Sequence, residues 1–205
     1  DPFYEDLYNL RTNNGTNMAG LFAYCNAPEL DLRNLGVSNV TDMSRMFDHC
    51  SSFVNIDSWD TSKVTNMSNM FYYFSGSIDI SKLNLSSVTD ATYMFSNVNT
   101  DNIILTGLSF PSTASLANIF NSATGDTLDL SSWDINNITN MNSMFSSANY
   151  KRIDLTGWNT NNVTNMYYML RVSSGSLEEL IIPDWDMTNV TNSSNFMNSS
   201  YSYKM

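Results

Sequence analysis

Histidine and basic residues are scarce in this sequence, and each shortage excludes a class of chemistry. The 205 residues include one histidine, His49, and nine lysines and arginines against 20 aspartates and glutamates, which gives a formal net charge of −11. A surface of that sign repels nucleic acid and anionic lipid. A single histidine also leaves little for metal binding or general-base catalysis. We therefore expect no nucleic-acid partner, no metal and no cofactor.

Long apolar runs are also missing. The longest wholly apolar stretches are only a few residues, whereas a membrane-spanning helix needs about 20. The sequence contains no basic segment followed by an apolar run, which is the pattern that would predict a signal peptide. We therefore expect no direct insertion into a membrane.

An internal repeat dominates what the sequence does contain. A phrase of the form V-T-x-M-x-x-M-F runs from Val40 to Phe47 and recurs, with substitutions, along the chain. Its last residue falls at Phe22, Phe47, Phe71, Phe95, Phe120, Phe145, Leu170 and Met197, a period of 24 to 27 residues. This regularity predicts a stacked solenoid, in which neighbouring units bury one another's apolar faces.

Within each unit the apolar spacing changes, and the change predicts the local structure. Met67, Met70, Phe71 and Phe74 are spaced as on one face of a short helix, with Thr65 as its N-cap. About eight residues before each phrase, apolar residues alternate, as Leu30 and Leu32 do, which is typical of a strand with one buried face. We predict an α/β, leucine-rich-repeat-like solenoid of about eight strand-plus-short-helix coils with one parallel sheet.

The same pattern predicts the organisation of the chain and its core. Residues 1–14 are expected to form an N-terminal cap, because Phe3, Leu7 and Leu10 have helical spacing; residues 15–200 form the repeat solenoid and residues 201–205 a C-terminal tail. The methionine and phenylalanine columns are interpreted as core. So is the column of large apolar residues that follows each strand: Leu35, Trp59, Leu83, Leu108, Trp133, Trp158 and Trp185.

The segment from Asp57 to Phe71, D-S-W-D-T-S-K-V-T-N-M-S-N-M-F, echoed from Leu128 to Asp134, resembles the BspA family of leucine-rich-repeat surface proteins. The resemblance covers approximately residues 15 to 200. It implies a bacterial cell-surface, lipoprotein or adhesin module, or a phage-borne (virion) relative, displayed extracellularly. It implies no catalytic residues. The sequence departs from the family pattern at Ala91, Leu116 and Ser193, where methionine is usual.

Two sets of residues are candidates for binding. Outward-facing strand residues should line the exposed sheet face, which is the usual binding face of such arrays; those selected are Asp31, Asn55, Asp57, Asp79, Asp129 and Asp154. Tyrosines between the core positions of the predicted helices should provide rigid aromatic contact area; these are Tyr72, Tyr73, Tyr93, Tyr167 and Tyr168. The alternative for the aspartates is a solubilising ladder, and for the tyrosines ordinary surface exposure.

Two further features leave alternatives open. Cys25 and Cys50 occupy the same column of adjacent units, either as two small buried apolar side chains or as a disulfide. His49 lies between Asp48 and Cys50 with no nucleophile motif nearby, and we interpret it as a surface side chain.

These observations predict a non-enzymatic, surface-displayed adhesion or receptor-binding module. Its expected partner is a host or matrix protein or a cell-surface glycan, and the sequence leaves the oligomeric state open. The alternative is a structural spacer that holds another domain away from a cell or virion surface. Ice binding, suggested by the aligned threonines, is disfavoured because those threonines are interpreted as helix caps.

Overall fold

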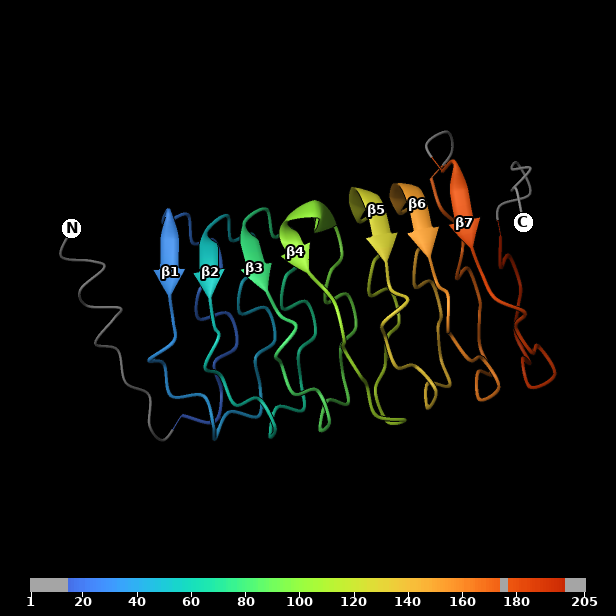
Figure 1. Cartoon of the computed structure of the whole chain (residues 1–205). Helices are drawn as coiled ribbons and strands as arrows, with labels where there is room; N and C mark the ends of the chain where they lie inside the picture. Colours follow the sequence, from blue (N-terminus) through green and yellow to red (C-terminus); the bar gives the residue numbers. More distant parts are fainter. Residues whose placement is uncertain (1–14, 174–176, 198–205) are drawn as a thin grey trace.

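The chain folds into a parallel β-solenoid. The computed structural model describes residues 15–173 and 177–197. Figure 1 shows the short strands side by side in chain order, all pointing the same way. The bounds are β1 Glu29–Asp31, β2 Phe53–Asn55, β3 Ser77–Asp79, β4 Ile103–Ile104, β5 Thr124–Asp129, β6 Asn149–Asp154 and β7 Glu179–Ile181. One 3₁₀ turn, η1 (Thr100–Asn102), precedes β4. The expected N-terminal cap over residues 1–14 and tail over residues 201–205 lie outside the described residues.

The strands pair in strict parallel register. They form a four-stranded sheet, β1-β2-β3-β4, and a three-stranded sheet, β5-β6-β7. Equivalent residues of successive units are partners: Leu30 pairs with Val54, and Leu128 with Ile153. Isolated bridges between Asn99 and Thr124 and between Ser109 and Asp134 join the coil of β4 to that of β5. The prediction of stacked units with parallel strands is therefore confirmed at the level of the solenoid.

The predicted fold class is wrong in its helices and in the number of coils. The structure is nearly all β, with 2% helical content, and makes about six turns rather than eight strand-plus-helix coils. Six steps separate β1 from β7 along the stack. The described residues therefore form a β-solenoid without a helical layer, and not the predicted leucine-rich-repeat-like α/β architecture.

Hydrogen bonding between coils explains why the methionine-rich segment is not helical. In the third unit the main-chain N–H groups of Met67, Asn69 and Phe71 donate to carbonyls of the next coil, at 2.8 to 3.0 Å. The alternate N–H groups, those of Met70 and Tyr72, donate three residues back, as in consecutive β-turns. The 3-and-4 spacing of apolar residues therefore arises from successive tight turns. Every second main-chain N–H group bonds to the neighbouring coil, whereas in a helix these groups would bond to carbonyls within the same segment.

Tight turns of this kind place one residue in four at positive φ. Asn69 has φ 55° and Tyr73 has φ 52°, and the same two columns are positive in the other coils. Asparagine and glycine tolerate this left-handed region best. Asparagine, serine and glycine accordingly fill many of these positions, including Gly20, Asn97, Asn118, Ser122, Ser143 and Ser147.

The apolar columns form the core, as predicted. Met67, Met70 and Phe71 are fully buried, and so are Ala91 and Leu116, which replace methionine in other coils. Phenylalanines stack along the axis from Phe22 to Phe145, with ring centroids 5.4 to 5.8 Å apart. Ser193 in the last coil is exposed. Departures from the repeat are therefore accommodated inside the stack and exposed only at its end.

Tryptophans tie one coil to the next. The indole Nε1–H of Trp59 donates to the main-chain carbonyl of Leu32 at 2.8 Å, that of Trp133 to Leu105 at 2.7 Å, and that of Trp158 to Leu130 at 2.9 Å. Each bond joins coils that are adjacent in the stack. A single side chain thus fills the core and satisfies a main-chain carbonyl of the preceding unit.

The regular spacing of the threonines along the chain also has a different cause from the one expected. The hydroxyl of Thr65 donates to the carbonyl of Thr41 at 3.1 Å, and that of Thr89 to the carbonyl of Thr65 at 3.1 Å. Main-chain N–H groups of the same residues donate to the same carbonyls. The threonines therefore form an inter-coil ladder and do not cap helices. The ladder is exposed, but its hydroxyl protons already bind main-chain oxygen.

Candidate binding surface

The aspartates on the strand face build turns. The Oδ1 atom of Asp79 accepts the main-chain N–H of Ser81 at 2.9 Å, and Asp129 and Asp154 accept from Ser131 and Thr156 at the same distance. Asp31 and Asn55 accept equivalent bonds from the main-chain N–H groups of Arg33 and Asp57. An acidic or amide oxygen two residues before a main-chain donor is the Asx-turn arrangement. The repeated carboxylates are therefore explained by the corner that follows each strand.

Two more corners of the coil use the same device. Asp60, Asn84, Asp134, Asn159 and Asp186 accept main-chain N–H bonds at the second corner. Asn17, Asp42, Asn66, Asp90, Asn140, Asn165 and Asn192 do so at the third. Much of the Asp and Asn content of the chain is thus a property of the fold.

Local hydrogen bonds and charges lower the pKa of several strand-face carboxyls. The Arg33 guanidinium, which hydrogen-bonds Asp31, holds the pKa of that carboxyl below its usual value. Hydrogen bonds from Ser81 do the same for Asp79. Burial raises the pKa of Asp154, but hydrogen bonds from Thr156 and Arg152 outweigh it, and the net shift is downward. These groups are ionised and already partnered, which weakens the case for them as a free cationic-ligand site.

The strand-face candidates lie along one edge of the stack without converging. Asp129 pairs in register with Asp154, and Asp31 with Asn55. Asp57 is exposed and meets Lys82 at 3.5 Å. Among residues 15–173 and 177–197, no group of three acidic, cysteine or histidine side chains is placed to hold a metal ion. Exposed apolar side chains, Phe53 and Ile104, accompany the acids on this face.

The candidate tyrosines lie on the outside of the turn segments, although not on helices. Tyr73, Tyr93 and Tyr167 are exposed, while Tyr72 and Tyr168 are half-buried. Tyr167 and Tyr168 pack edge to face with their ring centroids 4.2 Å apart, and the Arg171 guanidinium lies 4.9 Å from the ring centroid of Tyr168. Burial raises the pKa of Tyr72. Two aromatic groups result, one near each end of the solenoid.

The larger group is a ladder of three stacked rings. His49 lies between Tyr24 and Tyr73, with ring centroids 4.8 and 4.7 Å away and interplanar angles of 15° and 18°. Tyr72 packs edge-on against both His49 and Tyr73. We call Tyr24, His49, Tyr72 and Tyr73 the aromatic ladder. Because tyrosines cover both faces of the imidazole, His49 presents its ring edge outward, while Tyr24 and Tyr73 on either side of it are exposed.

A buried carboxylate anchors the middle of this ladder. Asp48 has only 1% of its surface exposed, and it accepts from Arg45 Nε at 2.8 Å. Its other oxygen lies 2.5 Å from Nδ1 of His49. This contact fixes the imidazole in the plane of the stack and leaves Nε2 for an external partner.

The backbone under the ladder is unfavourable for aromatic residues. Tyr24, His49 and Tyr73 have φ of 60°, 54° and 52°, a region that costs residues with a Cβ roughly 1–2 kcal/mol each. The next three coils place small polar residues at the same position, Asn97, Ser122 and Ser147. Stability alone therefore does not account for three rings in this column.

Sequence reasoning found Tyr72 and Tyr73 but missed Tyr24 and His49. Tyr24 lies outside the clearest copies of the repeat, and His49 was interpreted as an isolated surface side chain. The available signal was their column, because Tyr24, His49 and Tyr73 occupy the same position in consecutive units. Comparing exposed positions across units, as was done for core positions, would have placed them together.

The two cysteines are free thiols. Cys50 is buried, which raises the pKa of its thiol, and Cys25 is half-buried. Of the two arrangements left open by the sequence, the structure has the unbridged one. No described helix is long and apolar enough to cross a membrane.

A family profile described as "Mycoplasma protein of unknown function, DUF285" matches residues 1–108 and 111–205. The chain belongs to this family. The match covers both halves of the solenoid, in keeping with its internal repetition. Comparison with curated proteins and with solved structures finds no match. The DUF285 assignment carries no stated activity, so the function must be argued from the surface.

Proposed function

We propose that this DUF285 member is a non-enzymatic binding module that recognises a partner protein through the aromatic ladder. The observation that carries the proposal is the placement of Tyr24, His49 and Tyr73 at positive φ, where other coils use asparagine or serine. A strained backbone beneath exposed aromatic side chains is typical of a site kept for function. Tyrosines at the surface are also frequent hot spots in protein interfaces.

The stacking favours a protein over a sugar as the partner. Sugars are commonly held by contact with the open face of an aromatic ring, but both faces of His49 are covered by Tyr24 and Tyr73. Ring edges, phenol hydroxyls and the Nε2 atom of His49 suit hydrogen bonding to main-chain and polar side-chain groups. A host or matrix protein is therefore the proposed ligand. Binding to a cell-surface glycan instead would redirect the proposal.

Display outside the cell, or on a virion, is part of the same proposal. The resemblance of the repeat to BspA-family surface proteins supports it, as does an acidic, weakly charged surface. Accessibility of the chain to protease or antibody on intact cells tests this part separately from binding.

The binding test replaces the ladder with residues that the fold itself uses at that position. In the variant, Tyr24, His49 and Tyr73 all become Ser, as in Ser122 and Ser147. Immobilised wild-type and variant chains are compared against purified matrix and receptor proteins and against a glycan array. We expect a protein ligand whose affinity falls at least tenfold in the variant, with unchanged circular dichroism.

The matched control is the triple change of Asp79, Asp129 and Asp154 to Asn. It keeps the Asx turns, because the amide oxygen also accepts a main-chain hydrogen bond, and it should leave affinity intact. Loss of binding in this control with retention in the ladder variant would move the site to the strand face. Failure of every protein and glycan to bind would support a structural spacer instead.

A further inference from the structure

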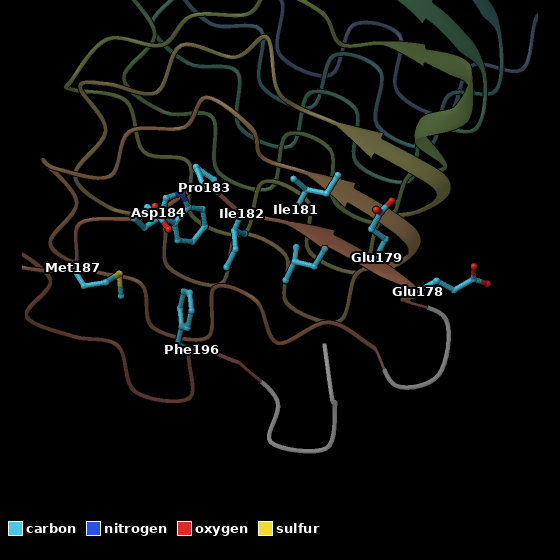
Figure 2. Close-up of a pocket in the computed structure, with 10 residues that line it drawn as sticks. Glu178, Glu179, Ile181, Ile182, Pro183, Asp184, Met187 and Phe196 are labelled. Atoms are coloured by element: carbon cyan, nitrogen blue, oxygen red, sulfur yellow. The ribbon is translucent and has the colours of Figure 1, made fainter. Parts of the chain in front are cut away.

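The last coil exposes an edge that the other coils cover. The outer side of β7 has no partner strand among the described residues. A groove of about 980 Å³ lies there, lined by residues between Glu178 and Met187 and by Phe196. Figure 2 shows the apolar side chains of Ile181, Ile182 and Phe196 flanked by Glu178 and Glu179 at one end and by Asp184 at the other.

Main-chain donors in this coil repeat the pattern that joins coils elsewhere. The N–H of Leu130 donates to the carbonyl of Asp154, and that of Leu155 to the carbonyl of Ile181, both at 2.9 Å. Ile182 is the next residue in this column, and no described residue accepts its N–H. Trp185 also lines this groove, so its indole is placed to report on a segment bound there. The edge therefore lacks what an adjacent extended segment would supply.

Charge at the edge indicates the chemistry of that segment. In the preceding pair of coils, Lys151 on β6 meets Asp126 on β5 at 2.7 Å. In the next column, Arg152 on β6 meets Glu179 on β7 at 2.7 Å. Acids occupy both positions in the last coil, Glu178 just before β7 and Glu179 at its first residue. A segment lying outside β7 in the same register would be favoured by basic residues opposite them.

Two copies of this chain do not satisfy the edge. A symmetric pairing of β7 with β7 would be antiparallel and would place the acidic residues 178–186 of both copies along one seam, with no lysine or arginine among them. Like charges close together across strands are destabilising. In a head-to-tail stack in the same register, Glu179 would face Glu29 of β1 in the next copy, which again places like charges opposite each other. These contacts favour a different molecule.

We propose that the outer edge of β7 binds an extended segment of another protein as an added parallel strand. That segment carries alternating apolar residues that cover Ile182 and Phe196, and lysine or arginine opposite Glu178 and Glu179. Its carbonyls accept the N–H of Ile182. This mode of recognition combines main-chain bonds for affinity with side-chain pairing for specificity, and it is independent of the aromatic ladder.

The chain supplies its own probe for the test. A synthetic peptide with the sequence of residues 149–156, N-Y-K-R-I-D-L-T, has the lysine, the arginine and the apolar alternation of β6. We expect saturable binding to the full chain, with slower hydrogen exchange at the Ile182 amide. A peptide with glutamate in place of its lysine and arginine should bind at least tenfold more weakly.

Variants of the protein locate the site. Ile182→Lys should reduce peptide affinity at least tenfold, because it places a cation in the groove, whereas Ile104→Lys changes an exposed isoleucine on the interior strand β4 and should have no effect. Trp185→Phe should remove the fluorescence change caused by the peptide. Absence of binding, equal affinity of the two peptides, or an Ile182 amide that is already fully protected without peptide would each overturn the proposal.

Discussion

Gly76 lies where the main chains of two coils approach each other closely. A Cβ atom added at this glycine would stand 1.9 Å from the carbonyl oxygen of Ser52 and 2.8 Å from the ring of Phe74. The nearest atom belongs to the backbone of the preceding coil, which cannot move without disturbing the pairing of β2 with β3.

Gly76→Ala should therefore destabilise the fold by about 3 kcal/mol, at the upper end of the usual cost of overpacking. Chemical denaturation followed by circular dichroism measures the change in unfolding free energy. Ser75→Ala, at the exposed neighbouring position, is the control and should change it little. If Gly76→Ala leaves the unfolding free energy unaltered, the coils are spaced more widely than described.

Asp79 illustrates how a strand-face carboxyl serves stability and how this depends on pH. Its hydrogen bond from Ser81 lowers the pKa in the folded state. A depressed pKa means that the stabilisation is present above the unfolded pKa of about 3.9 and is lost as pH falls through the folded value. Asp79→Ala should cost about 1 kcal/mol at pH 7, the net value of one hydrogen bond.

Asp79→Asn separates the hydrogen bond from the charge. The amide oxygen still accepts the N–H of Ser81, so stability at pH 7 should stay within about 0.5 kcal/mol of wild type. Unfolding free energies measured from pH 7 to pH 3 should fall less steeply than in wild type. If the two slopes coincide, the Asp79 carboxyl does not contribute to the acid sensitivity of the fold.

At the scale of the coil, tryptophan provides both volume and a bond to the preceding unit. Trp133 has 3% of its surface exposed, contacts Phe110 and Phe120, and donates to Leu105. Trp133→Ala removes all of these and should cost about 3 to 5 kcal/mol.

Trp133→Phe keeps most of the volume but leaves the Leu105 carbonyl without the indole donor. We expect it to cost less than the alanine variant, with about 1 kcal/mol assigned to the hydrogen bond. Both values come from denaturant titrations of the purified variants. An alanine cost below about 1 kcal/mol would mean that this column is not part of the core.

Periodicity in the sequence predicted the stacked units, the pairing of equivalent strand residues and the core, but not the number of coils or the conformation of the turn segment. Met67, Met70, Phe71 and Phe74 have helical spacing whether their N–H groups bond within the segment or to the next coil, so side-chain pattern alone cannot separate the two. A hint was present in the residues between them. Asn69, Asn118, Ser143 and Gly20 recur at one column, and residues suited to positive φ are out of place in the middle of a helix.

The candidate site was predictable only in part for a related reason. Aspartates on the strand face recur because every coil needs the same corner, so recurrence signals structure. The aromatic ladder is informative because it departs from the repeat, with rings in three coils where the later coils have Asn97, Ser122 and Ser147. In a repetitive chain the positions that break the pattern at the surface are better guides to binding than those that keep it.

For the molecule as a whole, the direction of the inter-coil hydrogen bonds has a mechanical consequence. These bonds lie along the axis of the solenoid, so a force that pulls the two ends apart acts directly on the hydrogen bonds between coils. The coils can therefore unfold one after another. A coil rises about 4.8 Å along the axis while folded, but its roughly 25 residues extend to about 85 Å when pulled straight. Stretching single molecules should therefore give a series of small, evenly spaced length increments at low force. A single abrupt release of the whole chain would contradict this. A tether built this way would lengthen under load and keep its two ends connected, absorbing sudden pulls on whatever it holds.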